Sequence, residues 1–348
     1  MPDGEDSRAR LLTLDGLRGL GALSVMLYHC GFVLKTPFVT HGHIAVDFFF
    51  LLSGFIMART YQHRLAAGDT GAFFRARLVR LWPLMAIGCC YGLAAALALY
   101  PTTPVLKLAI KFGLAILCVP LISSVPFPLN APQWSLLFEG VANICHALFL
   151  RRLAPFALGA IVLISAAGLV AGVAAHQDLN GAYRGAAMLT PLLRLVFSYC
   201  LGLLIYVLPR PKIRLPFWAA AVVFAAVALF PDLPAAPVFD LVAVLVVWPL
   251  LLVGSIDASA VSGVPASALR LAGALSYPLY ILHYPTLMLV IHFGAGWSPA
   301  VLIPIGVGLS LAAAWAGMLL DRPARKAFAA ALATVRPPKP LASGAAPS

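Results

Sequence analysis

The chain has 348 residues, of which 62% are hydrophobic and only 10% are Asp, Glu, Lys or Arg. A soluble domain carries roughly 25% charged residues, so a water-soluble enzyme, a disordered chain and a disulfide scaffold are all disfavoured. The remaining class is an integral membrane protein with many spans. In such a chain the net charge of +12 indicates Lys and Arg collected in cytoplasmic loops, and we expect no nucleic-acid partner.

Eleven apolar stretches follow one another along the chain, and each is a candidate transmembrane helix of about 20 residues. They lie at about 14–34, 44–62, 81–100, 105–125, 134–150, 153–175, 186–208, 215–230, 238–254, 271–293 and 299–320. The first contains Asp15 and Arg18, and no small-residue cleavage site follows it, so we interpret it as a retained span and not as a signal peptide. The sequence therefore predicts an all-α membrane protein.

The basic residues between the stretches indicate how many of them cross. If all eleven crossed, the pair Arg151–Arg152 would lie outside, together with the last basic cluster. The stretch at 105–125 contains Lys107 and Lys111 and leads into a proline-rich segment, which is typical of a re-entrant or interfacial element. If this stretch does not cross, most of the 24 basic residues lie inside. We therefore predict ten transmembrane helices with both termini in the cytoplasm.

The same pattern divides the chain into three parts. Residues 1–11 form a cytoplasmic N-terminal segment and residues 12–322 form the transmembrane domain. Residues 323–348 form a cytoplasmic tail, which we expect to be disordered because the chain from Arg336 onward is rich in Pro, Ala and Ser.

Ionisable residues inside spans are costly and mark function by default. Arg18 and His29 share the first span, and an interval of eleven residues places them on one helix face with about 16 Å of rise between them. This face could line a passage across the membrane. The alternative is that Arg18 reaches the inner headgroups and His29 is a satisfied core histidine.

Two acidic residues are predicted at a similar depth to His29. Asp47 is expected near the outer end of the second span, and Glu139 is expected near the outer end of the fifth. A carboxylate beside an imidazole holds its tautomer and raises its basicity, which gives a general base for a hydroxyl. A proton relay in a transporter needs the same chemistry, so both interpretations stay open.

Three further patterns have weaker meanings. His43 and Asp47 have a spacing that suits a metal, but no third ligand is evident, so we expect a polar loop and no metal. Arg75 and Arg77, with Arg80 one turn later, form either a simple cytoplasmic cluster or a clamp for the phosphates of a nucleotide-like donor. A helix-face stripe favours structural or substrate-lining roles over direct catalysis, and it consists of Ser276, Tyr280 and His283.

Five strings in this order resemble the acyltransferase 3 family of integral membrane acyltransferases, which O-acylate bacterial surface and exported polysaccharides. Essentially the whole chain, from about residue 12 to 322, follows the family's order and spacing. The strings are 14–19 running on to Tyr28 and His29, 46–55, 75–77 with 80–83 behind them, 134–139 and 276–283.

The resemblance implies an enzyme of the bacterial inner membrane. It would move an acyl group, with acetyl expected, from cytoplasmic acyl-CoA to a hydroxyl of an envelope or exported glycan or glycolipid. Acyl-CoA would be a co-substrate, with no permanently bound cofactor. The other partners would be the lipid bilayer and the machinery of polysaccharide synthesis.

The resemblance also implies roles for individual residues. His29 would be the catalytic base and Arg18 an essential residue on the same helix. Asp47 and Glu139 would orient His29 or the acceptor. Arg75, Arg77 and Arg80 would hold the CoA phosphates, and the substrate would be lined by Ser53, Trp134, Ser135, Ser276, Tyr277, Tyr280 and His283.

One departure and two rival functions stay open. After Glu139 the family continues with another acid and an aromatic pair, whereas this chain reads Gly140-Val141-Ala142-Asn143, which leaves the acceptor open. The first rival is a proton-coupled transporter of a glycan intermediate or acylated small molecule, with Asp47, Glu139 and His29 as the relay. The second is an inactive scaffold in a polysaccharide synthesis complex.

Overall fold

The computed structural model describes residues 3–123, 125–176, 179, 189–258 and 264–334, and within this part of the chain it contains helices and no strands. The prediction of an all-α protein is therefore confirmed. The helices of the N-terminal half are α1 Asp3–Val33, α2 Ala45–Ala66, α3 Thr70–Leu99, α4 Val105–Ile116, α5 Gln133–Leu148 and α6 Pro155–His176. Those of the C-terminal half are α7 Leu189–Val207, α8 Phe217–Ala228, α9 Ala236–Val242, α10 Trp248–Ile256, α11 Ala266–Phe293 and α12 Pro299–Thr334.

Seven helical segments in the described residues are long and apolar enough to cross a bilayer. They are Gly42–Ala66, Thr70–Leu99, Pro155–Ala175, Leu189–Val207, Ala236–Ile256, Ala266–Phe293 and Pro299–Thr334. The predicted count of ten is not reached by this measure. Helices α5 and α8 have only 16 and 12 residues, and the polar residues Asp15, Arg18 and His29 lower the mean hydropathy of α1.

The segment predicted not to cross forms α4, which has 12 residues. A helix of that length extends about 18 Å, against about 30 Å for the hydrocarbon core of a bilayer. It packs against α3, and the indole nitrogen of Trp82 donates a hydrogen bond to the carbonyl of Ile116, at 3.1 Å. By itself α4 is therefore too short to span.

Two helices extend beyond the predicted spans at 81–100 and 299–320. The stretch before residue 81 belongs to α3, which runs unbroken from Thr70 past Pro83 and places Arg75, Arg77 and Arg80 on one helix. Helix α12 continues to Thr334, so the expectation of disorder from residue 323 is wrong up to that point. Residues 324–334 are mostly alanine and other strong helix formers, and residues 335–348 lie outside the described part.

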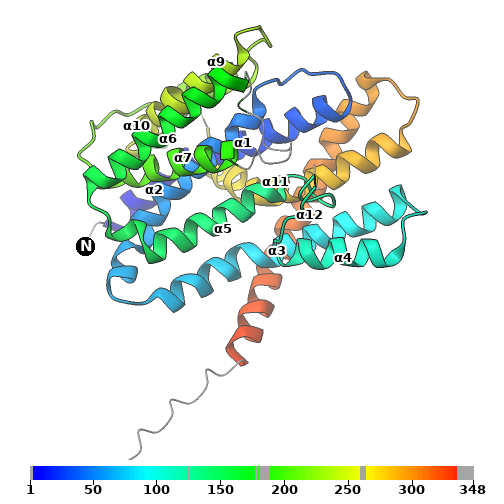
Figure 1. Cartoon of the computed structure of the whole chain (residues 1–348), viewed down its shortest axis with the longest axis horizontal. Helices are drawn as coiled ribbons and strands as arrows, with labels where there is room; N and C mark the ends of the chain where they lie inside the picture. The colour runs from blue at the N-terminus through cyan, green and yellow to red at the C-terminus, as the bar shows by residue number, and fades with distance from the viewer. Residues whose placement is uncertain (1–2, 124, 177–178, 180–188, 259–263, 335–348) are drawn as a thin grey trace, which may run out of the picture.

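The helices that position the site pack side by side in two groups. Helix α1 lies along α11, and α11 packs against α12, while α2 packs against α7 and α7 against α6 (Figure 1). Glycines let α2 and α7 approach closely, because a side chain on Gly54 would meet the carbonyl of Tyr199, and one on Gly202 would meet the carbonyl of Leu51. Close approach through small residues is the usual way that membrane helices associate.

We predict that Gly202→Ala lowers the free energy of unfolding by about 1–3 kcal/mol, because the new methyl group overlaps backbone atoms that cannot move aside. Thermal unfolding of the detergent-solubilised protein measures this change. Gly308→Ala is the matched control, since that helical glycine in α12 has no atom within 4 Å of the added carbon. Equal unfolding temperatures for the two variants would contradict the close contact.

Candidate active site

A cavity of about 330 Å³ opens where α1, α2, α3, α5, α11 and α12 converge. It gathers nine of the residues singled out in the sequence, namely Arg18, Ser53, Arg77, Arg80, Ser135, Glu139, Ser276, Tyr277 and Tyr280. Arg325 of α12 also lines it, and the sequence analysis did not select this residue. We call this space the arginine cavity.

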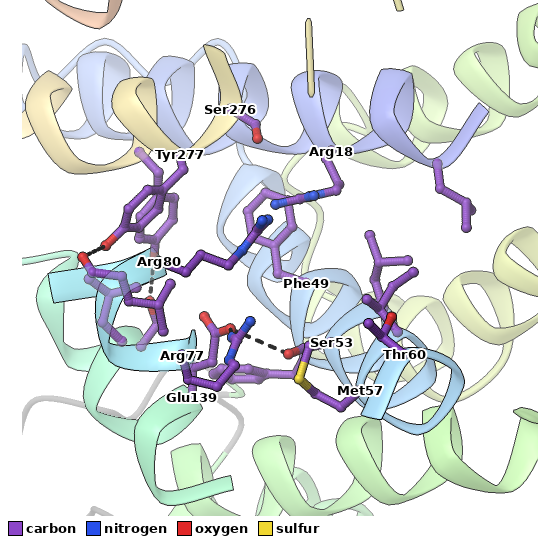
Figure 2. Close-up of a pocket in the computed structure, with 18 of the residues that line it drawn as sticks. Arg18, Phe49, Ser53, Met57, Thr60, Arg77, Arg80, Glu139, Ser276 and Tyr277 are labelled. Carbon is purple, nitrogen blue, oxygen red and sulfur yellow. Dashed lines mark hydrogen bonds and ion pairs between the residues drawn. The ribbon is translucent and has the colours of Figure 1, made fainter. Parts of the chain in front are cut away.

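The arginine cavity carries an excess of positive charge. Four guanidinium groups and two carboxylates line it, and Figure 2 shows the side chains of Arg18 and Arg80 extending toward each other across it. Arg18 is 3.8 Å from its neighbour Asp15, and both of these side chains are about one-third exposed. Cations that face one another in a partly enclosed space favour an anionic ligand, and guanidinium forks suit phosphate groups.

Glu139 belongs to the arginine cavity and is not a neighbour of His29. Its carboxylate accepts a hydrogen bond from Arg77, whose side chain is 7% exposed, and a longer one of 3.4 Å from the hydroxyl of Ser53 (Figure 2). The expectation that Glu139 orients His29 is therefore corrected. The reason is that α3 is one continuous helix and carries Arg77 into the bundle, where it needs a buried counter-charge.

Asp47 likewise has another partner than the one expected. It forms a buried ion pair with Arg194 of α7, with distances of 3.0 Å from Nε to Oδ1 and 2.5 Å from Nη2 to Oδ2. Arg194 is 1% exposed and Asp47 is fully buried. This bidentate pair ties α2 to α7, so the structure gives Asp47 a framework position and not a place beside His29.

His29 pairs with a second histidine from α11. Its Nδ1 lies 3.0 Å from Nε2 of His283, and Nδ1 of His283 lies 2.8 Å from the carbonyl oxygen of Leu279. A carbonyl only accepts, so Nδ1 of neutral His283 carries the hydrogen and its Nε2 is an acceptor. His29 must then donate from Nδ1, which leaves a lone pair on its Nε2.

Tyr280 of α11 contacts both the arginine cavity and this histidine pair. The hydroxyl of Tyr280 lies 2.6 Å from the hydroxyl of Ser135, and both residues line the cavity. The ring of Tyr280 contacts that of His283, with 6.1 Å between the ring centroids. Arg18 lines the cavity from the middle of α1, and the partly buried His29 lies farther along the same helix.

Five of the expected site residues do not line the arginine cavity. His29, Asp47 and His283 have the partners described above, and Arg75 and Trp134 lie elsewhere. Arg75 is exposed and donates a hydrogen bond of 3.3 Å to the carbonyl of Ala329 in α12. Trp134 is buried and packs edge-on against Phe50 and Phe138. Both were selected from their strings alone, which do not show which side chains point into a shared space.

A second cavity, of about 360 Å³, lies beyond the histidine end of α1. Tyr28 and Phe32 line it from α1, where their rings stack with 6.2 Å between centroids. Asp240 of α9 holds the polar side, because its two oxygens contact His41 at 2.5 Å and His43 at 3.1 Å. The sequence analysis treated His43 as part of a polar loop, and it did not detect the link to Asp240, which is about 200 residues away.

None of these clusters is a metal centre. Among the residues that the structure describes, no group of three or more His, Cys, Asp or Glu side chains is arranged to hold a metal ion. The spacing of His43 and Asp47 suits a metal site, but the carboxylate of Asp47 is paired with Arg194 instead.

We predict that Asp47→Ala destabilises the fold by roughly 3–5 kcal/mol, because it leaves the buried guanidinium of Arg194 without its counter-charge. The double variant Asp47→Leu, Arg194→Met should unfold at a higher temperature than Asp47→Ala, since it removes both charges together. Thermal unfolding in detergent measures both. A double variant no more stable than Asp47→Ala would show that the unpaired charge of Arg194 is not the cause of the destabilisation.

We also predict a pH-dependent contribution from His41, which lies before the second membrane span. Burial lowers its pKa, but the hydrogen bond and charge of Asp240, the backbone of Pro231 and the charge of Asp232 raise the pKa overall. A raised pKa in the folded state stabilises the fold below the ordinary value of about 6.5, and this stability is lost as the pH rises through the folded value.

The difference in unfolding temperature between the wild type and His41→Gln should therefore be larger at pH 5.5 than at pH 8.5. His292→Gln, which changes an exposed histidine at the end of α11, is the control. A difference that does not vary with pH would argue against a charged His41 in the folded protein.

Comparisons with known proteins identify the family of the chain. A family model described as an acyltransferase domain matches residues 11–319. A protein of Rhizobium radiobacter, named as protein 2 in the picA locus, is 32% identical over 183 residues, which is 45% of this chain and 95% of that protein. No solved structure matches. Because the family match covers most of the chain and its apolar helices suit a bilayer, the protein belongs to the acyltransferase 3 family of integral membrane acyltransferases.

Proposed function

We propose that this protein transfers an acyl group, with acetyl expected, from cytoplasmic acyl-CoA to a hydroxyl of an envelope or exported glycan. One observation carries the proposal: a single face of α1 has an arginine that lines a cavity and, eleven residues farther along, a histidine paired with a second histidine. The two are about 16 Å apart along the helix. A long donor can therefore have its phosphates bound at one end while its thioester reaches the other.

The donor end is the arginine cavity. Acyl-CoA is a polyanion, and the guanidinium groups of Arg18 and Arg80 converge where no ion pair to Arg80 is found among the described residues. Arg77 is already matched by Glu139, which also accepts a hydrogen bond from Ser53, so Arg77 shapes the wall instead of meeting the donor as a free charge. Of the clamp expected at Arg75, Arg77 and Arg80, this proposal keeps Arg80 and adds Arg18.

The chemical step is general base catalysis by His29. Its Nε2 takes the proton of the acceptor hydroxyl while the oxygen attacks the thioester carbon. The tetrahedral intermediate then collapses, the carbon–sulfur bond breaks, and the proton passes from His29 to the sulfur of the leaving CoA. His283 acts as a positioning residue, because its hydrogen bond fixes the tautomer and the ring plane of His29.

The acceptor end is the second cavity. Tyr28 is adjacent to His29 in the chain and its ring lies 5.4 Å from the imidazole, so a molecule bound there is close to the base. Aromatic faces with nearby carboxylate and imidazole groups suit a sugar ring, which has apolar faces and hydroxyl edges. This arrangement supports a glycan or glycolipid acceptor that arrives from the side opposite to the donor.

The contacts of the three ionisable residues support the acyltransferase interpretation over the transporter interpretation. The transporter interpretation requires Asp47, Glu139 and His29 to exchange a proton with one another. Each instead has a different partner: Arg194 for Asp47, Arg77 for Glu139 and His283 for His29. An inactive scaffold would have the same fold but would not transfer an acyl group, so a measurement of activity tests that interpretation.

The proposed function is tested with the purified protein in nanodiscs, acetyl-CoA labelled on the acetyl group, and the glycans extracted from the source cells. We expect label to appear covalently on glycan and free CoA to form in equal amount. Release of CoA without labelled glycan would contradict the proposal that the acceptor is a glycan. The absence of any reaction would contradict the proposal that the protein is an active acyltransferase. Movement of glycan across the membrane without labelling would favour a transporter.

We predict that His29→Ala lowers kcat by about 10²–10⁴-fold, because the hydroxyl then lacks its base. His283→Phe should lower kcat by a smaller factor and leave the KM for acetyl-CoA unchanged, because that variant retains the base but not its orientation. His292→Ala controls for the loss of a histidine from α11. Wild-type kcat in His29→Ala would overturn the mechanism, and wild-type kcat in His283→Phe would overturn the positioning role.

A further inference from the structure

The last turns of α12 pack onto the arginine cavity. We call residues 321–334 the C-terminal arm, and Figure 1 shows it projecting beyond the other helices, next to α3. The ring of Phe328 stacks on Trp82 with 4.6 Å between the centroids and 23° between the planes. Two turns earlier on α3, Arg75 donates a hydrogen bond to the carbonyl of Ala329. These two contacts fix the arm against α3.

The arm brings one arginine into the cavity. Arg325 lines it together with Arg18, Arg77 and Arg80, and its side chain is 29% exposed. Asp321, one turn earlier, holds the guanidinium with distances of 2.8 Å to Nε and 2.5 Å to Nη2. Asp321 lies outside the cavity lining and its charge offsets part of that of Arg325, whose side chain still faces the cavity. The four guanidinium groups that line the cavity outnumber its two carboxylates, and this excess favours a multiply charged anion.

We propose that the C-terminal arm forms one wall of the donor site and that Arg325 binds a phosphate of acyl-CoA. This inference rests on the proposed function and extends it. The family match ends at residue 319, so the arm is a feature of this chain that the family model does not describe. Acyl-CoA carries a diphosphate and a separate ribose phosphate, which gives it enough charge to engage Arg325 together with Arg18 and Arg80.

The test compares Arg325→Ala with Arg322→Ala in the full-length protein in nanodiscs. Arg322 is exposed on the same arm and does not line the cavity, so its variant removes the same charge without removing the contact. We expect Arg325→Ala to weaken the binding of CoA by tenfold or more, as roughly expected for one charge-assisted hydrogen bond, and Arg322→Ala to leave it within about twofold. Equal binding by the two variants would overturn the proposal.

A second donor separates phosphate binding from a structural role. Acetyl-pantetheine carries the thioester but has no phosphate. Arg325→Ala should therefore transfer acetyl from acetyl-pantetheine at the wild-type rate, whereas its KM for acetyl-CoA should rise. A loss of the same size with both donors would show that Arg325 only supports the fold. Phe328→Ala, which releases the arm from Trp82, should raise the KM for acetyl-CoA in the same direction.

The two readouts also separate this inference from the proposed function. Binding of CoA decides the role of Arg325, and transfer of labelled acetyl decides the reaction. If the wild type binds CoA, Arg325→Ala weakens this binding and no glycan is acylated, the inference about Arg325 holds and the proposed acceptor is wrong. A wild-type protein that does not bind CoA would overturn both.

Discussion

The long contact between α1 and α11 is the interaction on which the site depends. Gly19 of α1 lies against Ala272 of α11 so closely that no side chain fits between them, and farther along the same pair of helices His29 meets His283. Arg18 and His29 lie on one continuous helix, so helix geometry sets their separation, and the contact with α11 holds that helix in place. It also supplies the partner that selects the tautomer of His29, because His283 is itself held by the carbonyl of Leu279.

The buried charges divide into framework and site. Asp47 and Arg194 neutralise each other between α2 and α7, where isolated charges would be very unfavourable, and so they hold two helices in register. Glu139 neutralises Arg77 at the wall of the arginine cavity. His29 is left with a neutral imidazole as its neighbour, which orients the base without adding a permanent buried charge beside it.

The arginine cavity combines residues from six helices, and its composition differs from the cluster that is visible along the chain. Arg75 is near in sequence to Arg77 and Arg80 but points to the arm of α12. Arg325 is remote in sequence and lies in the cavity. Positive charge near the cytoplasmic end of a membrane protein serves its orientation in general, so only the direction of each side chain separates binding arginines from the rest.

The sequence by itself determined the protein class, the family and the shared face of Arg18 and His29. These properties depend on composition and on the geometry of a single helix, both of which are local. The tertiary structure decided which groups meet. Asp47 and Glu139 were expected beside His29 from their depth, yet depth does not specify which helices are neighbours. The partners Arg194, Arg77 and His283 are set by the packing of α7, α3 and α11, and a helical arm in place of part of a disordered tail brought Arg325 to the site.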